Sequence, residues 1–227
     1  HAVYNADGAS ITPPVDLDYA KAHCRIWDTE WRGAGIPPVV CLDGKDEPSF
    51  LHVLSGKNIR SHGYYYVHRK KGRWKQTLIR SSNHQWNSGY LSRDAKEILH
   101  AYLIVGDGYL EGGYMDKHGG GRIEEWISKD QGSSWKKLRD VTPNAKPYKG
   151  WRFNNVQPVV RPDGKVVEGM LLFYGWQDHD RPEATAFLFH EYPMPTHFLK
   201  FRIDPSANQN CFACPSLWFY AYEPLTL

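Results

Sequence analysis

The chain has 227 residues, enough to bury a sizeable core as one large domain or two small ones. Its formal net charge of +3 is too small for a typical nucleic-acid-binding protein, in which a basic face dominates the charge balance. No apolar run approaches the ~18 residues of a membrane-spanning helix, so we expect neither nucleic acid nor a membrane as a partner.

The first segment, residues 1–36, is predicted to be part of a four-stranded unit. The sequence opens at His1 with neither an initiator Met nor a signal-peptide pattern, so we expect a processed chain or a piece of a longer one. Cys24 could pair with Cys41 across neighbouring strands, and free buried thiols are the alternative.

Three later stretches look like versions of one another, each with a strand, a polar turn that contains Asp, and a more apolar strand. They are PVVCLDGKDEPSFLHVLSG (38–56), GYLSRDAKEILHAYLIVGDG (89–108) and PVVRPDGKVVEGMLLFYGW (158–176). Two more predicted strands follow each stretch: YYYVHR (64–69) and WKQTLI (74–79), RIEEWIS (122–128) and WKKLRDV (135–141), and ATAFLFH (184–190) and HFLKFRI (197–203).

Repeats of roughly 50–70 residues with four antiparallel strands are typical of β-propeller blades. We therefore expect an all-β propeller with blades at about 37–80, 88–141 and 154–204 and a closing strand at 217–227. Three blades and a fraction cannot close a ring. Either the loops hide more strands, or the chain is a propeller fragment and a partner fragment supplies the missing blades.

The segment from Ser128 to Trp135, SKDQGSSW, matches the Asp-box pattern S-x-D-x-G-x-x-W of sialidase-like propeller blades. In that pattern the Asp caps turn amides, the Gly permits a tight turn and the Trp packs into the blade. We assign this segment a structural role.

The basic stretch 63–80, GYYYVHRKKGRWKQTLIR, is predicted to be a hairpin with a three-residue loop, Lys70 to Gly72. In that register Arg69 faces Arg73, and Tyr64 and Arg80 lie at the other end within two rungs of each other.

The Asp box, a Tyr followed by an Arg sixteen residues later, and an upstream His resemble the propeller-fold polysaccharide lyases. These include the ulvan lyases and the rhamnose–glucuronate lyases that act on gum arabic side chains. The likeness spans most of the chain and looks closest to the rhamnose–glucuronate group in DTEW (28–31), VVCLDG (39–44), SFLHVLSG (49–56), QWNSGYL (85–91) and FNNVQPVVRPDGKVV (153–167).

The resemblance implies β-elimination at a 4-linked uronic acid, with an acidic polysaccharide or oligosaccharide as the substrate. By position, Tyr64 would transfer the proton, Arg80 would neutralise the carboxylate, and His1 and His23 would be the family's histidines. Inter-blade packing is the alternative for Tyr64, and a hydrogen-bonded core position is the alternative for His23. The substrate type and the possible disulfides suggest a secreted or periplasmic protein.

Weaker candidates for substrate binding lie on predicted loops and strand ends, and for each of them an ordinary surface or strand-end residue is the favoured interpretation. They are His84, Trp86 and Asn87 after Arg80, His118 and Arg122 around the run Gly119–Gly121, and Arg152. Cys211 and Cys214 have the spacing of metal ligands, which is a weak zinc signal without a second pair. No cofactor is certain; a structural or substrate-bridging Ca or Zn ion is possible. The acidic stretch 178–183 could bind a cation, although a solvated loop is the favoured interpretation of it.

Three rival functions remain open. An exo-sialidase would need three arginines on one carboxylate, a role open to Arg80, Arg122 and Arg152. A lectin-like propeller would keep the aromatic side chains and lack catalysis. An amino-terminal His1 could hold copper, as in the oxidative polysaccharide monooxygenases, although the repeats argue against the sandwich fold of those enzymes.

Overall fold

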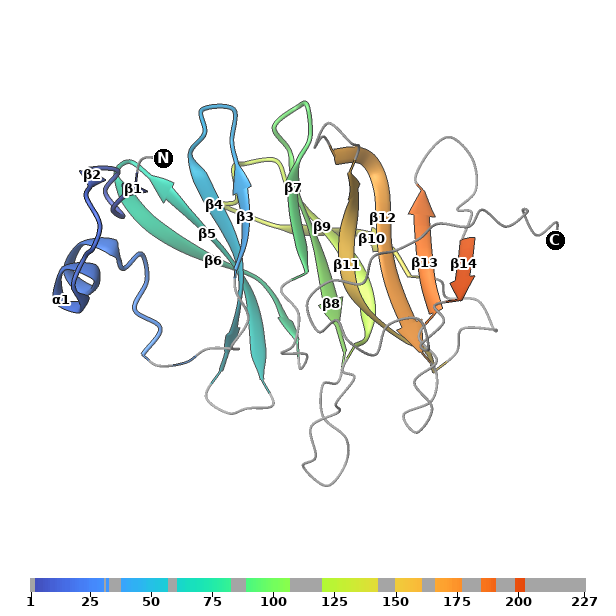
Figure 1. Ribbon diagram of the computed structural model, residues 1–227. Helices are drawn as coiled ribbons and strands as arrows, with labels where there is room; N and C mark the ends of the chain where they lie inside the picture. The colour runs from blue at the N-terminus through green and yellow to red at the C-terminus, as the bar shows by residue number, and fades with distance from the viewer. Residues whose placement is uncertain are drawn as a thin grey trace, which may run out of the picture.

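A computed structural model shows the fold of the chain and describes residues 3–30, 32, 38–56, 61–82, 89–106, 120–142, 150–160, 166–176, 185–190 and 199–202. The described part is mostly β (Figure 1). No described helix is both long and apolar enough to cross a membrane.

Three four-stranded antiparallel sheets make up the body of the molecule, and the chain order of the strands is also their order across each sheet (Figure 1). Sheet 1 contains β3 (Val39–Leu42), β4 (Pro48–Ser55), β5 (His62–Lys70) and β6 (Arg73–Ser82). Sheet 2 contains β7 (Tyr90–Arg93), β8 (Leu99–Val105), β9 (Arg122–Ser128) and β10 (Lys136–Asp140). Sheet 3 contains β11 (Arg152–Val160), β12 (Val166–Trp176), β13 (Thr185–His190) and β14 (Leu199–Arg202).

These sheets confirm the predicted repeats of four strands each. The described residues do not form a closed ring of sheets. The predicted closing strand, 217–227, lies outside the described residues.

The amino-terminal segment differs from the blade strands that the sequence predicted. It contains a two-stranded hairpin, β1 (Val3–Tyr4) and β2 (Ser10–Ile11), followed by a helical turn, α1 (Leu17–Tyr19), and a π-helical turn, η1 (Ala20–Cys24). Pro13 and Pro14 follow the hairpin after Thr12 and carry no N–H to continue a ladder. Asp16 then starts the helical turn by accepting a hydrogen bond from the Tyr19 amide at 2.7 Å.

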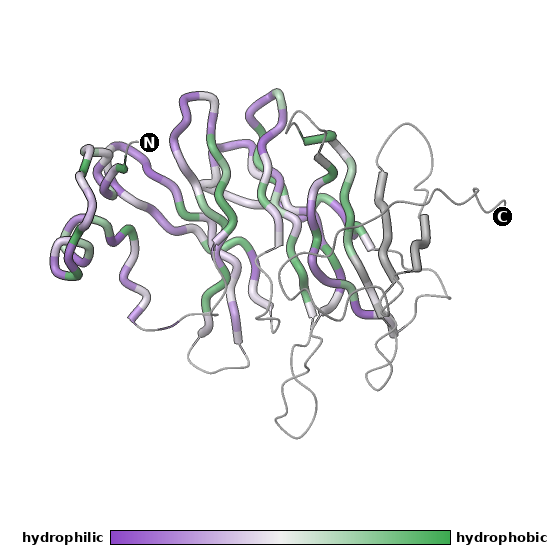
Figure 2. The backbone as a smooth tube through the Cα atoms, viewed as in Figure 1, coloured by the Kyte–Doolittle hydropathy of each residue, from purple (hydrophilic) through white to green (hydrophobic). Residues whose placement is uncertain are grey.

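Sheet 2 lies between two apolar cores, and its strand β8 is therefore buried on both faces. Alternate residues of this strand, including Leu99 and Leu103, pack against sheet 1. Tyr102 and Ile104 pack on the other side, against Phe153 and other residues of sheet 3. Burial on both faces explains why LHAYLIV is a nearly continuous apolar run, which appears as a hydrophobic stretch in Figure 2.

Sheets 2 and 3 are joined at a glycine. Gly121 and Phe153 form an isolated antiparallel bridge, with N–H···O distances of 3.0 and 2.8 Å between their backbones. A Cβ on Gly121 would overlap the carbonyl group of Val105 and lie 2.7 Å from the Cα of Gly106. Glycine is therefore required here so that three backbone segments can approach one another.

The Asp-box turn joins β9 to β10 and also contacts sheet 1. Ser134 donates two hydrogen bonds to the carboxylate of Asp130, one from its hydroxyl at 2.6 Å and one from its N–H at 2.9 Å. These hydrogen bonds lower the pKa of Asp130 to about 2. Gly132 has a φ of +82°, and a side chain there would overlap the buried ring of Tyr66. Trp135 meets the same ring edge-on, with centroids 5.4 Å apart. The capping and the tight turn agree with the predicted structural role, and Trp135 packs against the neighbouring sheet.

The β5–β6 hairpin has a shorter loop than the sequence predicted. Lys70 pairs with Arg73, so the loop has two residues and Arg69 faces Trp74 instead of Arg73. A β-bulge at Ile79 then shifts the register, and Tyr64 becomes the direct partner of Arg80. The expected proximity of these two residues is confirmed, although the predicted register was wrong.

Candidate functional site

A group of cationic side chains surrounds Glu124, a residue of β9 whose side chain is only 2% exposed. We call it the Glu124 cluster. Its carboxylate lies 3.0 Å from Lys137 Nζ, and Trp126 Nε1 donates to it at 2.9 Å. Two guanidinium groups lie farther from the same carboxylate, Arg122 at 3.5 Å and Arg80 at 3.7 Å.

The two arginines of the Glu124 cluster come from different sheets and remain open to solvent. Arg80 extends from β6 of sheet 1 across the ring of Trp126, 5.9 Å from its centroid. The side chains of Arg80 and Arg122 are 41% and 63% exposed. Because a guanidinium group carries five N–H donors, each can hold Glu124 and still bind a second carboxylate.

The structure thus brings together two residues that the sequence singled out separately. Arg80 was predicted to neutralise a carboxylate and Arg122 to bind substrate, and both reach the same buried acid. Arg152, the third candidate arginine, begins β11 and is half-buried beside Gly120. The backbone at Gly120 and Gly121 approaches Val105 and Phe153 of the chain itself, whereas the sequence suggested that this run approaches a ligand.

Tyr64 lies behind Arg80 in the core between sheets 1 and 2. Its side chain is 0% exposed, and its hydroxyl donates to the carbonyl of Ile104 at 2.8 Å. Burial raises the pKa of Tyr64 far above its ordinary value. Its role in proton transfer stays a prediction. In this arrangement the hydroxyl is enclosed, as the alternative of inter-blade packing expects.

We expect Tyr64→Phe to lower the free energy of unfolding by only about 1 kcal/mol, because Ser82 Oγ also donates to Ile104 O, at 3.1 Å. The acceptor therefore keeps one partner when the phenol is lost. Urea unfolding measures the change. Tyr65→Phe on the same strand is the matched control, and we expect it to change stability by less than about 0.5 kcal/mol. A loss above about 3 kcal/mol for Tyr64→Phe would contradict this account.

The remaining predicted site residues fall into two groups. His23 is exposed on η1, where its ring contacts Tyr19 with centroids 4.6 Å apart, so the alternative of a core position was wrong. The others lie outside the described residues: His1, His84, Trp86, Asn87, His118, Cys211 and Cys214, together with the acidic stretch 178–183. Cys24 and Cys41 are free thiols, so the possible disulfide between them is not formed.

A second charged group lies on the opposite face of β9, around Glu125, whose side chain is 1% exposed. We call it the Glu125 network. The carboxylate lies 2.7 Å from His100 Nδ1 and 2.6 Å from Arg139 Nε, and Tyr102 donates its hydroxyl at 3.2 Å. The hydrogen bond to Glu125 raises the pKa of His100, and Asp94 adds to the effect.

The sequence carries a signal for both groups that is not part of any motif. Glu124 and Glu125 are adjacent acids in RIEEWIS, a strand that is buried on both faces. A buried carboxylate needs a partner, and two adjacent ones need partners on opposite faces of the strand. Lys137 and Arg139 of β10 provide them.

In the described part of the chain, no group of three or more His, Cys, Asp or Glu residues is arranged to hold a metal ion. No family model matches the chain, and no curated protein matches it.

Proposed function

We propose that this chain is part of a β-propeller lyase that cleaves a 4-linked uronic acid glycoside, and that the Glu124 cluster binds the uronate carboxylate. Three consecutive four-stranded antiparallel sheets with an Asp-box turn support the propeller. The first strands of neighbouring sheets, β3 with β7 and β7 with β11, contact each other, as the inner strands of propeller blades do.

The observation that carries the proposal is the surplus of positive charge in the Glu124 cluster. Among the residues that the structure describes, Arg80, Arg122 and Lys137 contribute three cations to the cluster, and Glu124 and Asp140 contribute two carboxylates. A uronate carboxylate would balance the remaining charge. The arginines are exposed enough to bind it through two parallel hydrogen bonds, and Trp126 offers an aromatic ring beside them.

In β-elimination a base removes the proton from C5, the electron pair forms the C4–C5 double bond, and the 4-linked oxygen leaves as it takes a proton. Negative charge accumulates on the carboxylate in the transition state, so a guanidinium group already in place lowers the barrier. We assign this role to Arg80. Tyr64 stays a predicted proton-transfer residue, and to act it would have to release Ile104 O.

The test is an ultraviolet absorbance assay for unsaturated product over a panel of uronic acid polysaccharides, including gum arabic and ulvan. We expect Arg80→Ala to lower kcat/KM by at least about 100-fold, because it removes charge stabilisation of the transition state. Arg73→Ala is the control, since Arg73 is exposed at the other end of the same strand. If no polysaccharide yields product, or if both variants lose activity equally, the lyase proposal fails.

A non-catalytic carbohydrate-binding propeller is the second candidate, and the enclosure of Tyr64 favours it. Such a protein would bind uronic acid oligosaccharides through Arg80 and release no product. Tyr64→Phe separates the two functions. In a lyase that uses the phenol, turnover stops while stability falls by about 1 kcal/mol; in a binding protein, affinity for the oligosaccharide is unchanged.

A further inference from the structure

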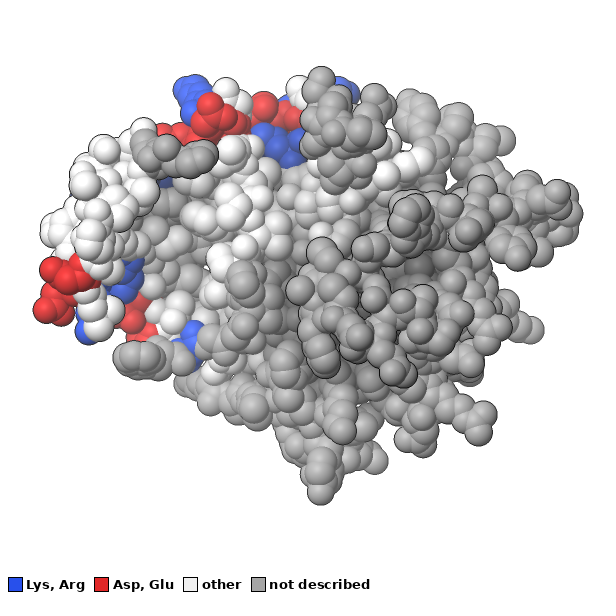
Figure 3. Space-filling view, viewed as in Figure 1, with Lys and Arg blue, Asp and Glu red and all other residues white. Residues whose placement is uncertain are grey.

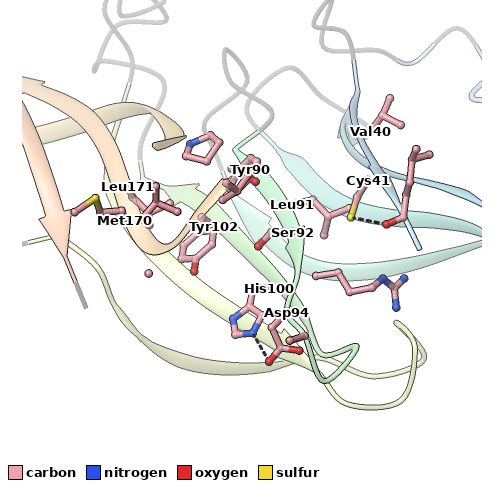
Figure 4. A pocket seen from close by; sticks show the side chains of 17 residues that line it. Val40, Cys41, Tyr90, Leu91, Ser92, Asp94, His100, Tyr102, Met170 and Leu171 are labelled. Carbon is pink, nitrogen blue, oxygen red and sulfur yellow. Dashed lines mark hydrogen bonds and ion pairs between the residues drawn. The ribbon is translucent and has the colours of Figure 1, made fainter. Parts of the chain in front are cut away.

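A cleft of about 400 Å³ opens among the three sheets, on the face of sheet 2 that carries the Glu125 network (Figure 4). Apolar side chains form two of its walls, Val40 and Leu42 from β3 and Met170 and Leu171 from β12. Val40 and Leu42 are more than half exposed, although they are apolar. A volume of this size lies at the lower end of the range for small-molecule sites.

The wall formed by sheet 2 is polar, because Ser92 and His100 are direct partners across β7 and β8 and both line the cleft. The stacked rings of Tyr90 and Tyr102 lie next to them, with centroids 6.1 Å apart. Asp94 follows at the end of the strand, and Figure 4 shows its carboxylate beside the imidazole of His100.

Two polar atoms at this wall are held in place, and they form only a long ion pair with each other. His100 Nδ1 is 2.7 Å from Glu125, which leaves Nε2 directed toward Asp94. Asp94 Oδ1 accepts from the amides of Lys96 and Ile98, which leaves Oδ2. Nε2 and Oδ2 are 3.6 Å apart, too far for a good hydrogen bond. A hydroxyl group can bridge such a pair, because it accepts from the imidazole N–H and donates to the carboxylate.

The charges at the cleft disfavour an ionic ligand. Asp94 lines it, Glu125 lies directly behind His100, and both repel an anion. Arg93 lines it as well, but its charge is compensated by Glu97 at 3.3 Å; His100 carries positive charge when it is protonated and then repels a cation. Arg139 is paired with Glu125 at 2.6 Å. The ligand that fits is uncharged, with hydroxyl groups on one side and an apolar surface on the other.

We propose that this cleft is a binding site for a neutral pyranose, whose hydroxyl bridges Asp94 and His100 and whose C–H face packs against Met170 and Leu171. The site is separate from the Glu124 cluster, which lies on the other face of sheet 2, and it does not depend on the proposed lyase activity. One domain would then hold a charged sugar at one place and a neutral sugar at another.

Methionine methyl NMR tests the proposal directly, because the chain has only three Met residues and Met170 lines the cleft. We expect methyl glycosides of glucose, galactose, mannose or rhamnose to shift the Met170 resonance saturably. Glucuronate should bind at this site at least about tenfold more weakly than the best neutral glycoside.

Asp94→Asn is the decisive variant, since it keeps an acceptor for the turn amides but replaces Oδ2 with an N–H donor. We expect it to weaken binding at least about tenfold. Asp43→Asn is the matched control, because Asp43 accepts from the Lys45 and Glu47 amides in the corresponding turn of sheet 1 and does not line this cleft. It should leave the affinity unchanged.

Ser92→Ala decides the question if Asp94→Asn does not fold, because it leaves the turn intact; we expect a loss of about threefold. The proposal fails if no neutral glycoside shifts Met170, if the Asp94 and Asp43 variants lose binding alike, or if glucuronate binds as well as the neutral sugars. Arg80→Ala should leave this binding intact, so a failure of the lyase proposal can be told apart from a failure here.

Discussion

Glu125→Gln is expected to lower the free energy of unfolding by about 3 kcal/mol. The carboxylate is 1% exposed and contacts His100 and Arg139 at 2.7 and 2.6 Å. An amide cannot accept from both, because one of its two terminal atoms is a donor. The change therefore leaves the partly buried side chains of His100 and Arg139 with a single acceptor oxygen between them, and the Tyr102 hydroxyl at 3.2 Å competes for that oxygen.

Glu97→Gln is the control for this prediction. Glu97 also pairs with an arginine, Arg93 at 3.3 Å, but its side chain is 59% exposed. Exposed ion pairs contribute little, so we expect a change below about 1 kcal/mol. Urea unfolding at pH 5.5 measures both variants. Equal losses would show that the burial of Glu125 does not determine its contribution.

The same pair predicts a pH dependence. Glu125 raises the pKa of His100 above its ordinary 6.5, so this stability is full below pH 6.5 and is lost as pH rises through the raised pKa. Burial raises the pKa of Glu125, but His100 and Arg139 outweigh it, and the net shift is below the ordinary 4.5. That contribution is full above pH 4.5 and is lost as pH falls. The difference between wild type and Glu125→Gln should therefore be largest between pH 4.5 and 6.5.

Gly121→Ala is expected to cost about 4 kcal/mol or more. The new Cβ would overlap the Val105 carbonyl and lie 2.7 Å from the Cα of Gly106, and both are backbone atoms that cannot rotate away. To make room, β9 would have to move away from β8, and the backbone pair between Gly121 and Phe153 would break. Sheet 3 would lose this direct connection to sheet 2.

Gly44→Ala is the matched control, because a Cβ at Gly44 would meet only the Glu97 carboxylate, at an ordinary 3.6 Å. We expect that variant to stay within about 0.5 kcal/mol of wild type. Thermal unfolding compares the two. If Gly121→Ala unfolds at the same temperature as wild type, the backbones of β8 and β9 do not approach each other closely enough to require glycine.

The division into three four-stranded sheets was predictable because the turns within the repeats contain recognisable turn-forming residues. Asp43 and Asp94 stand at the same place in two repeats, and each accepts from amides two and four residues later. Such local chemistry is visible in the sequence, and so were the strands on either side. The amino-terminal segment was less predictable, since its short strands bury little and give no clear period.

The site was only partly predictable, for two physical reasons. The pairing of Tyr64 with Arg80 depends on a bulge at Ile79, which turns that side chain into the core; no local residue type signals it. The burial of Tyr64 depends on β8 of the next sheet, which supplies the carbonyl of Ile104. Sequence spacing indicated which residues lie near one another, whereas the enclosure of Tyr64 required the packing of two sheets.

In the described part of the chain, each of the three large sheets is made of four strands that are consecutive along the chain, with neighbours joined in order. Most strand contacts are therefore local, and a sheet can fold as soon as its own segment has left the ribosome. The Asp-box turn contacts Tyr66 of the preceding sheet, so sheet 1, once folded, offers a surface on which sheet 2 can pack. We infer that the chain folds vectorially during synthesis, with each sheet docking on the one made before it.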